Sequence, residues 1–331
     1  MNLAERITLM VNLGKYLMED NEELKAVKKK AFEKNKWFTE EFISYAFKNI
    51  SINYLDPEKL KAWVQYYHLD DNIHPQTIGV VMAGNIPLVG FHDFLTVFIS
   101  GHHQKIKLSD KDDVLMKYLI EKLQLWNAKI SGVVSVSPML KDCDAYIATG
   151  SNNSARYFHH YFGKYPSIIR SNKTSVAVLS GNETVEQLRC LADDVYIYFG
   201  LGCRNVSKIY VPENYNFERL LNSFNKYNYF SDLTKYRNNY DYNLALFIMN
   251  NQFYMTNGSI ILSKNESVFS PVSVLNYSFY EDQKTVFDEL KKNENIQCIV
   301  GENHTPFGQS QEPGLFDYAD GIDTMQFLLS L

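Results

Sequence analysis

The sequence predicts an α/β protein in which two α/β lobes follow a helical N-terminal segment. Three observations support this fold class. Apolar residues recur at helical spacing through residues 1–70, strands and helices alternate from about 75 to 170, and the alternation begins again at 173. A chain of 331 residues is also too long for one small core and fits two lobes.

The first lobe begins with a βαβ unit. The apolar run from Thr77 is a predicted strand that ends at Gly84, and a helix over 90–101 leads to a second strand over 103–109. Ile7, Met10 and Val11 carry the helical spacing of the segment before it. Because the alternation continues to about residue 170, we expect a doubly wound parallel sheet.

The second lobe restarts the pattern. A strand follows Lys173, a helix is predicted over 183–199, and a bend around Cys203 leads into a strand over 206–212. A further helix is expected from about Asn216 to Lys226. Tyrosine and asparagine are dense after it, and their pattern assigns elements only loosely.

Composition excludes several classes of protein. Hydrophobic residues make up 45%, charged residues 21%, and mean hydropathy is -0.28, which is typical of a soluble domain. A formal charge of -5 argues against sequence-independent binding of nucleic acid. We find no secretory signal and no apolar run of roughly 18 residues that would span a membrane, so we expect a cytoplasmic protein.

Cysteine and histidine usage gives no metal site. The four cysteines form no CxxC pair, so reduced thiols are the default; they are Cys143, Cys190, Cys203 and Cys298. Adjacent histidines occur at 102–103 and 159–160, but neighbouring side chains on a helix or strand point apart and chelate poorly.

Cys203 stands out because it lies in a glycine-rich bend, GLGCR. A free cysteine is ordinarily a small buried apolar residue. Here Gly202 permits close approach of a ligand to the backbone, and Arg204 favours the thiolate, which is the nucleophilic form. We interpret Cys203 as a nucleophile, with Arg204 as a surface ion-pair partner being the plainer alternative.

Four motifs in order resemble the aldehyde dehydrogenase superfamily, and specifically its LuxC-like branch of fatty acyl-CoA reductases. MAGNIPLVG resembles the PWNFPL segment, KIKLSD the VLKPSE segment, TGSNNSARYF the GSxxxG turn, and GLGCR the GQxC segment. ESVFSPV, residues 266–272, is a weaker echo of EIFGPV, and PFGQS at 306–310 is another. The resemblance covers roughly residues 75–331 and implies an aldehyde-dehydrogenase-like fold with a Rossmann-type cofactor lobe and a catalytic lobe.

The resemblance also implies domain boundaries. Residues 1–172 would form the helical lead-in and the dinucleotide-binding lobe, and residues 173–305 the catalytic lobe with the cysteine. Residues 306–331 would return to the cofactor lobe.

By the same resemblance, Cys203 is the acylated thiol and Asn85 is the amide that stabilises the oxyanion. The residues implied for cofactor binding are Lys107, Ser109, Asp110, Gly150, Ser151 and Phe269. Plainer roles exist for several of them: Asn85 as a turn residue, Lys107 as a solvated charge, Ser151 as a helix N-cap, and Phe269 as core or acyl-tunnel lining.

The sequence departs from the oxidising members of the superfamily at one important position. Those enzymes carry a glutamate in an ELGGK segment that activates water to hydrolyse the thioester. Ile169 stands at that position, 34 residues before Cys203, while Lys173 matches the lysine. An enzyme that delivers hydride to a thioester has no use for activated water, so this loss points to a reductase.

We therefore expect an acyl-CoA reductase that transfers an acyl group from CoA, or from an acyl-carrier thioester, to Cys203 and reduces it with NADPH, or with NADH. A reductase of acyl phosphates is the nearest alternative. A cysteine-dependent acyltransferase or thioesterase without hydride transfer is another, which Ala155 and Ser267 favour because they depart from the cofactor motifs. A catalytically silent scaffold is the last. A homodimer is compatible with the sequence. The sequence does not specify the length of the substrate's acyl chain.

Overall fold

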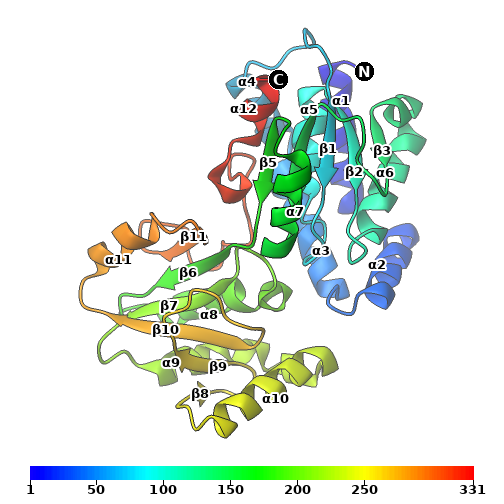
Figure 1. Ribbon diagram of the computed structural model, residues 1–331. Helices are drawn as coiled ribbons and strands as arrows, with labels where there is room; N and C mark the ends of the chain where they lie inside the picture. The colour runs from blue at the N-terminus through cyan, green and yellow to red at the C-terminus, as the bar shows by residue number, and fades with distance from the viewer. The chain divides into compact units, whose positions relative to one another are not determined.

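The computed structural model describes residues 1–331, which form two compact units. Unit 1 contains Met1–Asn172 together with Pro313–Leu331, and unit 2 contains Lys173–Glu312. The chain thus returns to unit 1 at Pro313, a few residues later than the position 306 expected from the sequence. Unit 1 has the greater share of the helices (Figure 1).

Unit 1 is built on a five-stranded sheet in the order β3-β2-β1-β4-β5, and every strand pair in it is parallel. Buried parallel strands read as continuous apolar runs, as Ile78, Val80 and Val81 do. The strands are β1 (Thr77–Val81), β2 (His103–Lys107), β3 (Val134–Val136), β4 (Ala145–Thr149) and β5 (Ser167–Arg170). The prediction of a doubly wound parallel sheet is confirmed.

Three helices connect these strands, with α7 on the opposite face of the sheet from α5 (Figure 1). They are α5 (Phe91–Ser100), α6 (Val114–Trp126) and α7 (Asn152–Phe162), with a 3-10 turn, η2, at Ala128–Gly132. Helix α5 is buried over nearly its whole surface because neighbouring helices cover it. The chain order therefore reverses direction between β1 and β4, which lie side by side at the centre of the sheet.

The helical N-terminus is also confirmed. Its elements are α1 (Leu3–Leu17), α2 (Glu22–Lys34), α3 (Glu40–Asn49), a π-helical turn η1 (Ile50–Tyr54) and α4 (Pro57–Tyr66). The α-helices begin at side-chain N-caps, Asn2, Asn21, Thr39 and Asp56, each of which accepts a backbone N–H of the first turn.

The C-terminal segment completes unit 1. It contains a 3-10 turn η5 (Ala319–Gly321) and helix α12 (Thr324–Leu329), which packs on α5. Trp63 is fully buried, and its indole N–H donates to the Tyr318 hydroxyl at 3.0 Å. The core of unit 1 therefore includes residues from both ends of the chain.

Unit 2 contains a six-stranded sheet in the order β11-β6-β7-β10-β9-β8, in which β8 alone is antiparallel to its neighbour. The strands are β6 (Thr174–Val178), β7 (Val206–Pro212), β8 (Met255–Thr256), β9 (Ile261–Lys264), β10 (Val274–Tyr280) and β11 (Ile296–Gly301). Its helices are α8 (Val185–Tyr196), α9 (Phe217–Ser223), α10 (Thr234–Met249) and α11 (Gln283–Leu290), with 3-10 turns η3 (Ile197–Gly200) and η4 (Phe224–Asp232).

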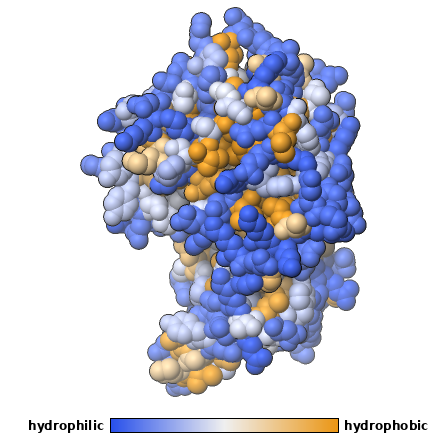
Figure 2. Space-filling view, turned by 90° about the vertical axis from the view of Figure 1, so that its right-hand side faces the viewer, coloured by the Kyte–Doolittle hydropathy of each residue, from blue (hydrophilic) through white to orange (hydrophobic).

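The end of α10 leaves apolar residues exposed at the lower end of unit 2, where Figure 2 shows hydrophobic residues gathered. Ile248, Met249 and Phe253 are 59%, 81% and 74% exposed. Across both units, none of the helices combines the length and the apolar character that a bilayer crossing demands.

Candidate functional site

The carboxyl edge of the unit 1 sheet carries the predicted cofactor lysine. Lys107 is the last residue of β2, pairs with Val81 of β1, and is exposed. Its carbonyl accepts the Met82 amide at 3.0 Å, so the two strands end together. Ser109 and the exposed Asp110 follow directly in the loop to α6.

The loops after β1 and β2 are in close contact at Gly84. A Cβ atom at this glycine would lie 2.6 Å from Ser109 Oγ and 3.1 Å from the Asp112 nitrogen. Glycine is therefore required for the two loops to approach this closely. Asn85 comes next in the chain and its side chain is exposed at this edge.

The loop after β4 provides the third part of this edge. Gly150 donates to the Arg170 carbonyl at 3.2 Å, and Ser151 is the N-cap of α7, accepting the Ser154 amide at 3.2 Å. Ser151 therefore has the role of a helix N-cap, which is the plainer of its two expected roles. The Thr149 hydroxyl, at the end of β4, is buried and has no hydrogen-bond partner.

This arrangement fits a dinucleotide. In doubly wound sheets a ligand binds outside the carboxyl ends of the strands, where the strand order reverses, and here that point lies between β1 and β4. A helix N-terminus begins there at α7, and such a terminus attracts phosphate. The buried hydroxyl of Thr149 is a further polar group that a ligand at this edge would satisfy.

In unit 2, Cys203 lies just before β7 and is half-buried. The chain reaches it through three consecutive left-handed residues: Tyr198, Phe199 and Gly200 have φ of 56°, 58° and 74°. The predicted helix over 183–199 is therefore wrong at its end, because α8 stops at Tyr196 and the backbone reverses its twist. Left-handed φ is costly for aromatic residues and persists only where the surroundings compensate.

Burial compensates part of this cost. The side chains of Tyr198 and Phe199 are 6% and 3% exposed. The Phe199 ring packs on Phe230 and Tyr236, with centroids 4.7 Å and 5.8 Å away. The bend before Cys203 is thus anchored in an aromatic core contributed by η4 and α10.

Asn205 supplies the rest of the anchorage, and sequence reasoning missed it. The Asn205 side-chain oxygen accepts the Gly202 backbone N–H at 2.8 Å, and the Asn205 backbone N–H donates to the Gly202 carbonyl at 3.1 Å. The side-chain NH2 of Asn205 donates to three backbone carbonyls at the end of α8, those of Asp194, Val195 and Ile197. At 1% exposure, Asn205 fixes the backbone on both sides of Cys203.

A second cysteine lies beside this bend. The Ser175 hydroxyl is 3.1 Å from the Cys203 carbonyl, to which it donates, and 3.0 Å from Cys298 Sγ. Burial raises the pKa of the Cys298 thiol, an effect that the Arg204 charge opposes. The thiol of Cys298 is thus held in its neutral form near the backbone of the candidate nucleophile.

Asp194 ties α8 to the loop that contains the PFGQS segment. Its fully buried carboxylate accepts the Gly308 amide at 2.7 Å and the Ser310 amide at 2.9 Å. Burial raises its pKa to about 6, although both amides act in the opposite direction. The segment 306–310 therefore packs in unit 2, next to the end of α8.

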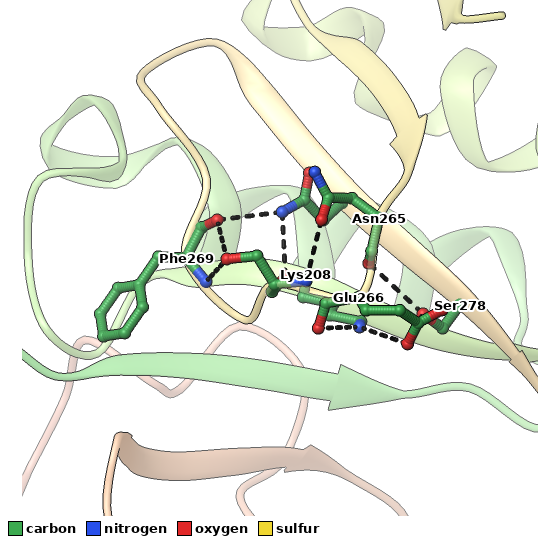
Figure 3. A network of polar contacts seen from close by, with 7 residues as sticks. Lys208, Asn265, Glu266, Phe269 and Ser278 are labelled. Atoms are coloured by element: carbon green, nitrogen blue, oxygen red, sulfur yellow. Dashed lines mark hydrogen bonds and ion pairs between the residues drawn. The ribbon is translucent and has the colours of Figure 1, made fainter.

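The loop that carries Phe269 is fixed by the polar network of Figure 3. The ammonium of Lys208, on β7, is buried and donates to the Glu266 carbonyl at 2.8 Å, while the Glu266 carboxylate lies 3.6 Å away. The Asn276 amide donates to the carbonyls of Ser267 and Phe269, both at 3.0 Å. Burial lowers the pKa of Lys208, which Glu266 partly offsets.

Phe269 itself is 39% exposed. The Ser207 hydroxyl donates to the Val268 carbonyl at 2.5 Å, which brings this loop to the amino end of β7. Because Cys203 enters the same end of β7, unit 2 gathers Cys203 and Phe269 around one strand end. Unit 1 gathers the other predicted residues at its own edge: Asn85, Lys107, Ser109, Asp110, Gly150 and Ser151.

Ile169 lies on β5 and is half-buried, so an apolar side chain occupies the position that corresponds to the water-activating glutamate of the ELGGK segment. Lys173 is the first residue of unit 2. No group of three histidine, cysteine or acidic side chains is placed to hold a metal ion.

The fold is that of the aldehyde dehydrogenases. The chain superposes on aldehyde dehydrogenase from Bacillus cereus with a TM-score of 0.66 at 13% identity, over 91% of this chain and 72% of the other. It is similar to aldehyde dehydrogenase 21 from Physcomitrella patens with a TM-score of 0.63 at 14% identity, over 92% of this chain and 74% of the other.

A putative methylmalonate-semialdehyde dehydrogenase from Sinorhizobium meliloti, in complex with NAD, gives a TM-score of 0.64 at 12% identity, over 94% of this chain and 74% of that one. No protein-family model and no curated protein sequence matches the chain. The likeness therefore lies in the fold, and the expectation of an aldehyde-dehydrogenase-like architecture is confirmed.

Proposed function

We propose that this protein is an acyl-CoA reductase that uses Cys203 as its nucleophile. Attack of the Cys203 thiolate on the thioester carbonyl forms a new carbon–sulfur bond, and the CoA thiolate leaves and takes up a proton. The resulting Cys203 thioester would be reduced by hydride, which NADPH, or NADH in its place, would supply when bound. Collapse of the thiohemiacetal then releases the aldehyde and restores the cysteine.

The observation that carries this proposal is that the chain has both a rigid bend at Cys203 and an apolar residue at position 169. Asn205 and the aromatic core hold Cys203 half-buried, as an acylated nucleophile requires. Ile169 cannot deprotonate water, so a thioester on Cys203 would not be hydrolysed by the route that oxidising dehydrogenases use. Hydride transfer then becomes the productive fate of the acyl group.

The proposed cofactor site is the carboxyl edge of the unit 1 sheet. Lys107 would hold ribose hydroxyls, Ser109 and Asp110 would flank it, and the turn of Gly150 and Ser151 would receive the pyrophosphate at the start of α7. Phe269 of unit 2 is the remaining residue that we propose for cofactor binding. Support comes from the arrangement of these residues at the strand ends and from the unpartnered Thr149 hydroxyl.

Asn85 is proposed to stabilise the oxyanion that forms when the thioester carbonyl is attacked. Donors of this kind lower the barrier by about 3–4 kcal/mol in other enzymes. Asn85 is exposed at the sheet edge, so its side chain is accessible to a substrate, as this role requires.

The test is an assay with saturated acyl-CoAs of increasing length and each reduced cofactor, followed by cofactor absorbance and by mass spectrometry of the protein. We expect aldehyde formation and a Cys203-linked acyl group, both abolished in Cys203→Ala. Cys190→Ala is the matched control, since Cys190 lies on α8 in the same unit, and it should keep the activity.

Aldehyde formation by Cys203→Ala would overturn the proposal. Release of free CoA without consumption of NADPH would assign the cysteine to a thioesterase or acyltransferase. Turnover of acyl phosphates but not of acyl-CoAs would favour the other reductase class of the same superfamily.

A further inference from the structure

We propose that Asp112 is a positioning residue that holds the Asn85 loop in its active geometry. This inference rests on the proposed function, because it assigns Asp112 a role that acts through Asn85. Asp112 lies in the loop between β2 and α6, three residues after Ser109, and is outside the KIKLSD segment, which ends at Asp110.

The contact that carries the inference joins two loops. The Asp112 side-chain oxygen Oδ2 accepts the Leu88 backbone amide at 2.6 Å. Leu88 is three residues after Asn85 and has a left-handed φ of 55°, a conformation that a bulky residue adopts only when its surroundings impose it. Asp112 thus holds the strained residue at the far end of the segment that presents Asn85.

A second contact places the near end of that segment. Gly84 lies against Ser109 so closely that a Cβ atom there would collide with the serine side chain. The Asp112 amide in turn donates to the Ser109 carbonyl at 3.0 Å. The loop from Ser109 to Asp112 therefore touches the Asn85 segment on both sides of Asn85.

Burial makes the Asp112 contact strong. Asp112 is 7% exposed, and its other oxygen, Oδ1, is buried without a partner. Burial raises the carboxyl pKa well above its usual range, and the neighbouring Asp113 charge acts in the same direction, whereas the Leu88 amide opposes it. The Asp112 carboxyl oxygen satisfies the Leu88 amide, which would otherwise be a buried donor without a partner.

The Asp112 loop has its own anchor outside this contact. Lys34 forms an ion pair with Asp113 at 2.5 Å, and the Asn35 amide donates to the Lys111 carbonyl at 3.2 Å. Removing the Asp112 side chain therefore releases the Asn85 segment while α2 still holds the loop that follows Lys107. The defect should fall on the chemical step rather than on cofactor affinity.

The experiment measures single-turnover acylation of Cys203 by acyl-CoA, using intact-protein mass, alongside a fluorescence titration with NADPH. In Asp112→Ala we expect acylation to slow by about 10- to 100-fold, as misplacement of a catalytic group by about 1 Å does, with less than about a threefold change in NADPH affinity. Asp112→Asn keeps an acceptor for Leu88 and should restore most of the rate.

Asp144→Ala is the matched control. Asp144 also accepts a backbone amide through its side chain, that of Thr77 at 2.7 Å, but at the amino end of β1. Its loss should leave acylation unchanged. In the Asn85→Ala background, Asp112→Ala should add little to the loss already present, because both changes remove the same contribution.

The outcomes separate the two proposals. If the unmodified protein does not acylate Cys203, the proposed function fails and this inference fails with it. If it does acylate, equal rates in Asp112→Ala and the unmodified protein overturn the inference alone, as do multiplicative losses in the double variant. Amide hydrogen exchange at Leu88 checks the contact itself: protection should fall in Asp112→Ala and persist in Asp112→Asn.

Discussion

Asn205 and Gly202 form two hydrogen bonds with each other on either side of Cys203. The Asn205 side-chain oxygen accepts the Gly202 backbone N–H, and the Asn205 backbone N–H donates to the Gly202 carbonyl. The cysteine between them is therefore enclosed in a short closed loop of backbone. Because Asn205 also binds the end of α8, the position of Cys203 is set by the helix before it and the strand after it.

The first prediction concerns the loss of that side chain. Asn205→Ala leaves one buried amide and three carbonyls without their partner, so we expect the free energy of unfolding to fall by about 2–4 kcal/mol. Urea denaturation measures this loss. Labelling of Cys203 by a thiol reagent should also become faster at concentrations below the unfolding transition. Asn238→Ala, an exposed change on α10, should alter neither quantity.

The second prediction concerns the contact between the loops of unit 1. Gly84→Ala places a methyl group against Ser109, and overpacking of this kind costs about 1–3 kcal/mol. We expect a lower melting temperature and weaker binding of NADPH. Ser109→Gly in the same chain should restore the melting temperature, because it removes the colliding atoms. Gly132→Ala should have no such effect, since nothing lies within 4 Å of a Cβ there.

The third prediction is a pH dependence of stability. The Asp194 pKa is raised from 3.8 to about 6 by folding, so between these values the folded chain holds a proton that the unfolded chain releases. Its contribution to stability is fully present below about pH 4 and is lost as the pH rises through about 6. Two pKa units correspond to about 3 kcal/mol.

Urea denaturation at several pH values checks this expectation. In Asp194→Asn, the free energy of unfolding should not show the fall that Asp194 causes between about pH 4 and 6. Asp241→Asn, which changes an exposed carboxylate on α10, should retain the full slope. Identical pH profiles for Asp194→Asn and the unmodified protein would contradict the assignment.

The fourth prediction concerns the network around Lys208. Lys208→Met preserves most of the buried volume, and replacing a buried charge in this way often costs little stability, whereas Lys208→Ala leaves a cavity worth about 2–4 kcal/mol. Both variants free the Glu266 carbonyl. We expect faster amide exchange at Ser267 and Phe269 in both, and no change in Lys264→Met, which alters a solvent-exposed lysine.

Much of the fold is predictable from the sequence because its signals are local. The strands of unit 1 are short apolar runs such as that of Ile78 to Val81, bounded by glycine, and the N-terminal helices carry helical spacing and capping residues. The tyrosine- and asparagine-rich stretch after α9 is less predictable, because a 3-10 helix, η4, is followed at once by α10 and neither has a clear apolar stripe.

The parts that escaped prediction depend on contacts between residues distant in sequence. The segment that ends at Phe199 has the composition of a helix, and its left-handed last turn depends on distant aromatic residues of η4 and α10 and on Asn205. Asp112 binds an amide 24 positions before it, and Asp194 binds amides more than 110 positions after it. A lone acidic residue gives no sign of such a partner.

The order in which the chain is synthesised has a consequence for how it folds. Unit 2 is one continuous segment and is complete once Glu312 has left the ribosome, whereas unit 1 waits for residues 313–331. Until then the partners of Met325 and Leu328, 0% and 1% exposed in the finished protein, present apolar surface to chaperones. A nascent chain halted after residue 312 would therefore hold a folded unit 2 and an unfinished unit 1.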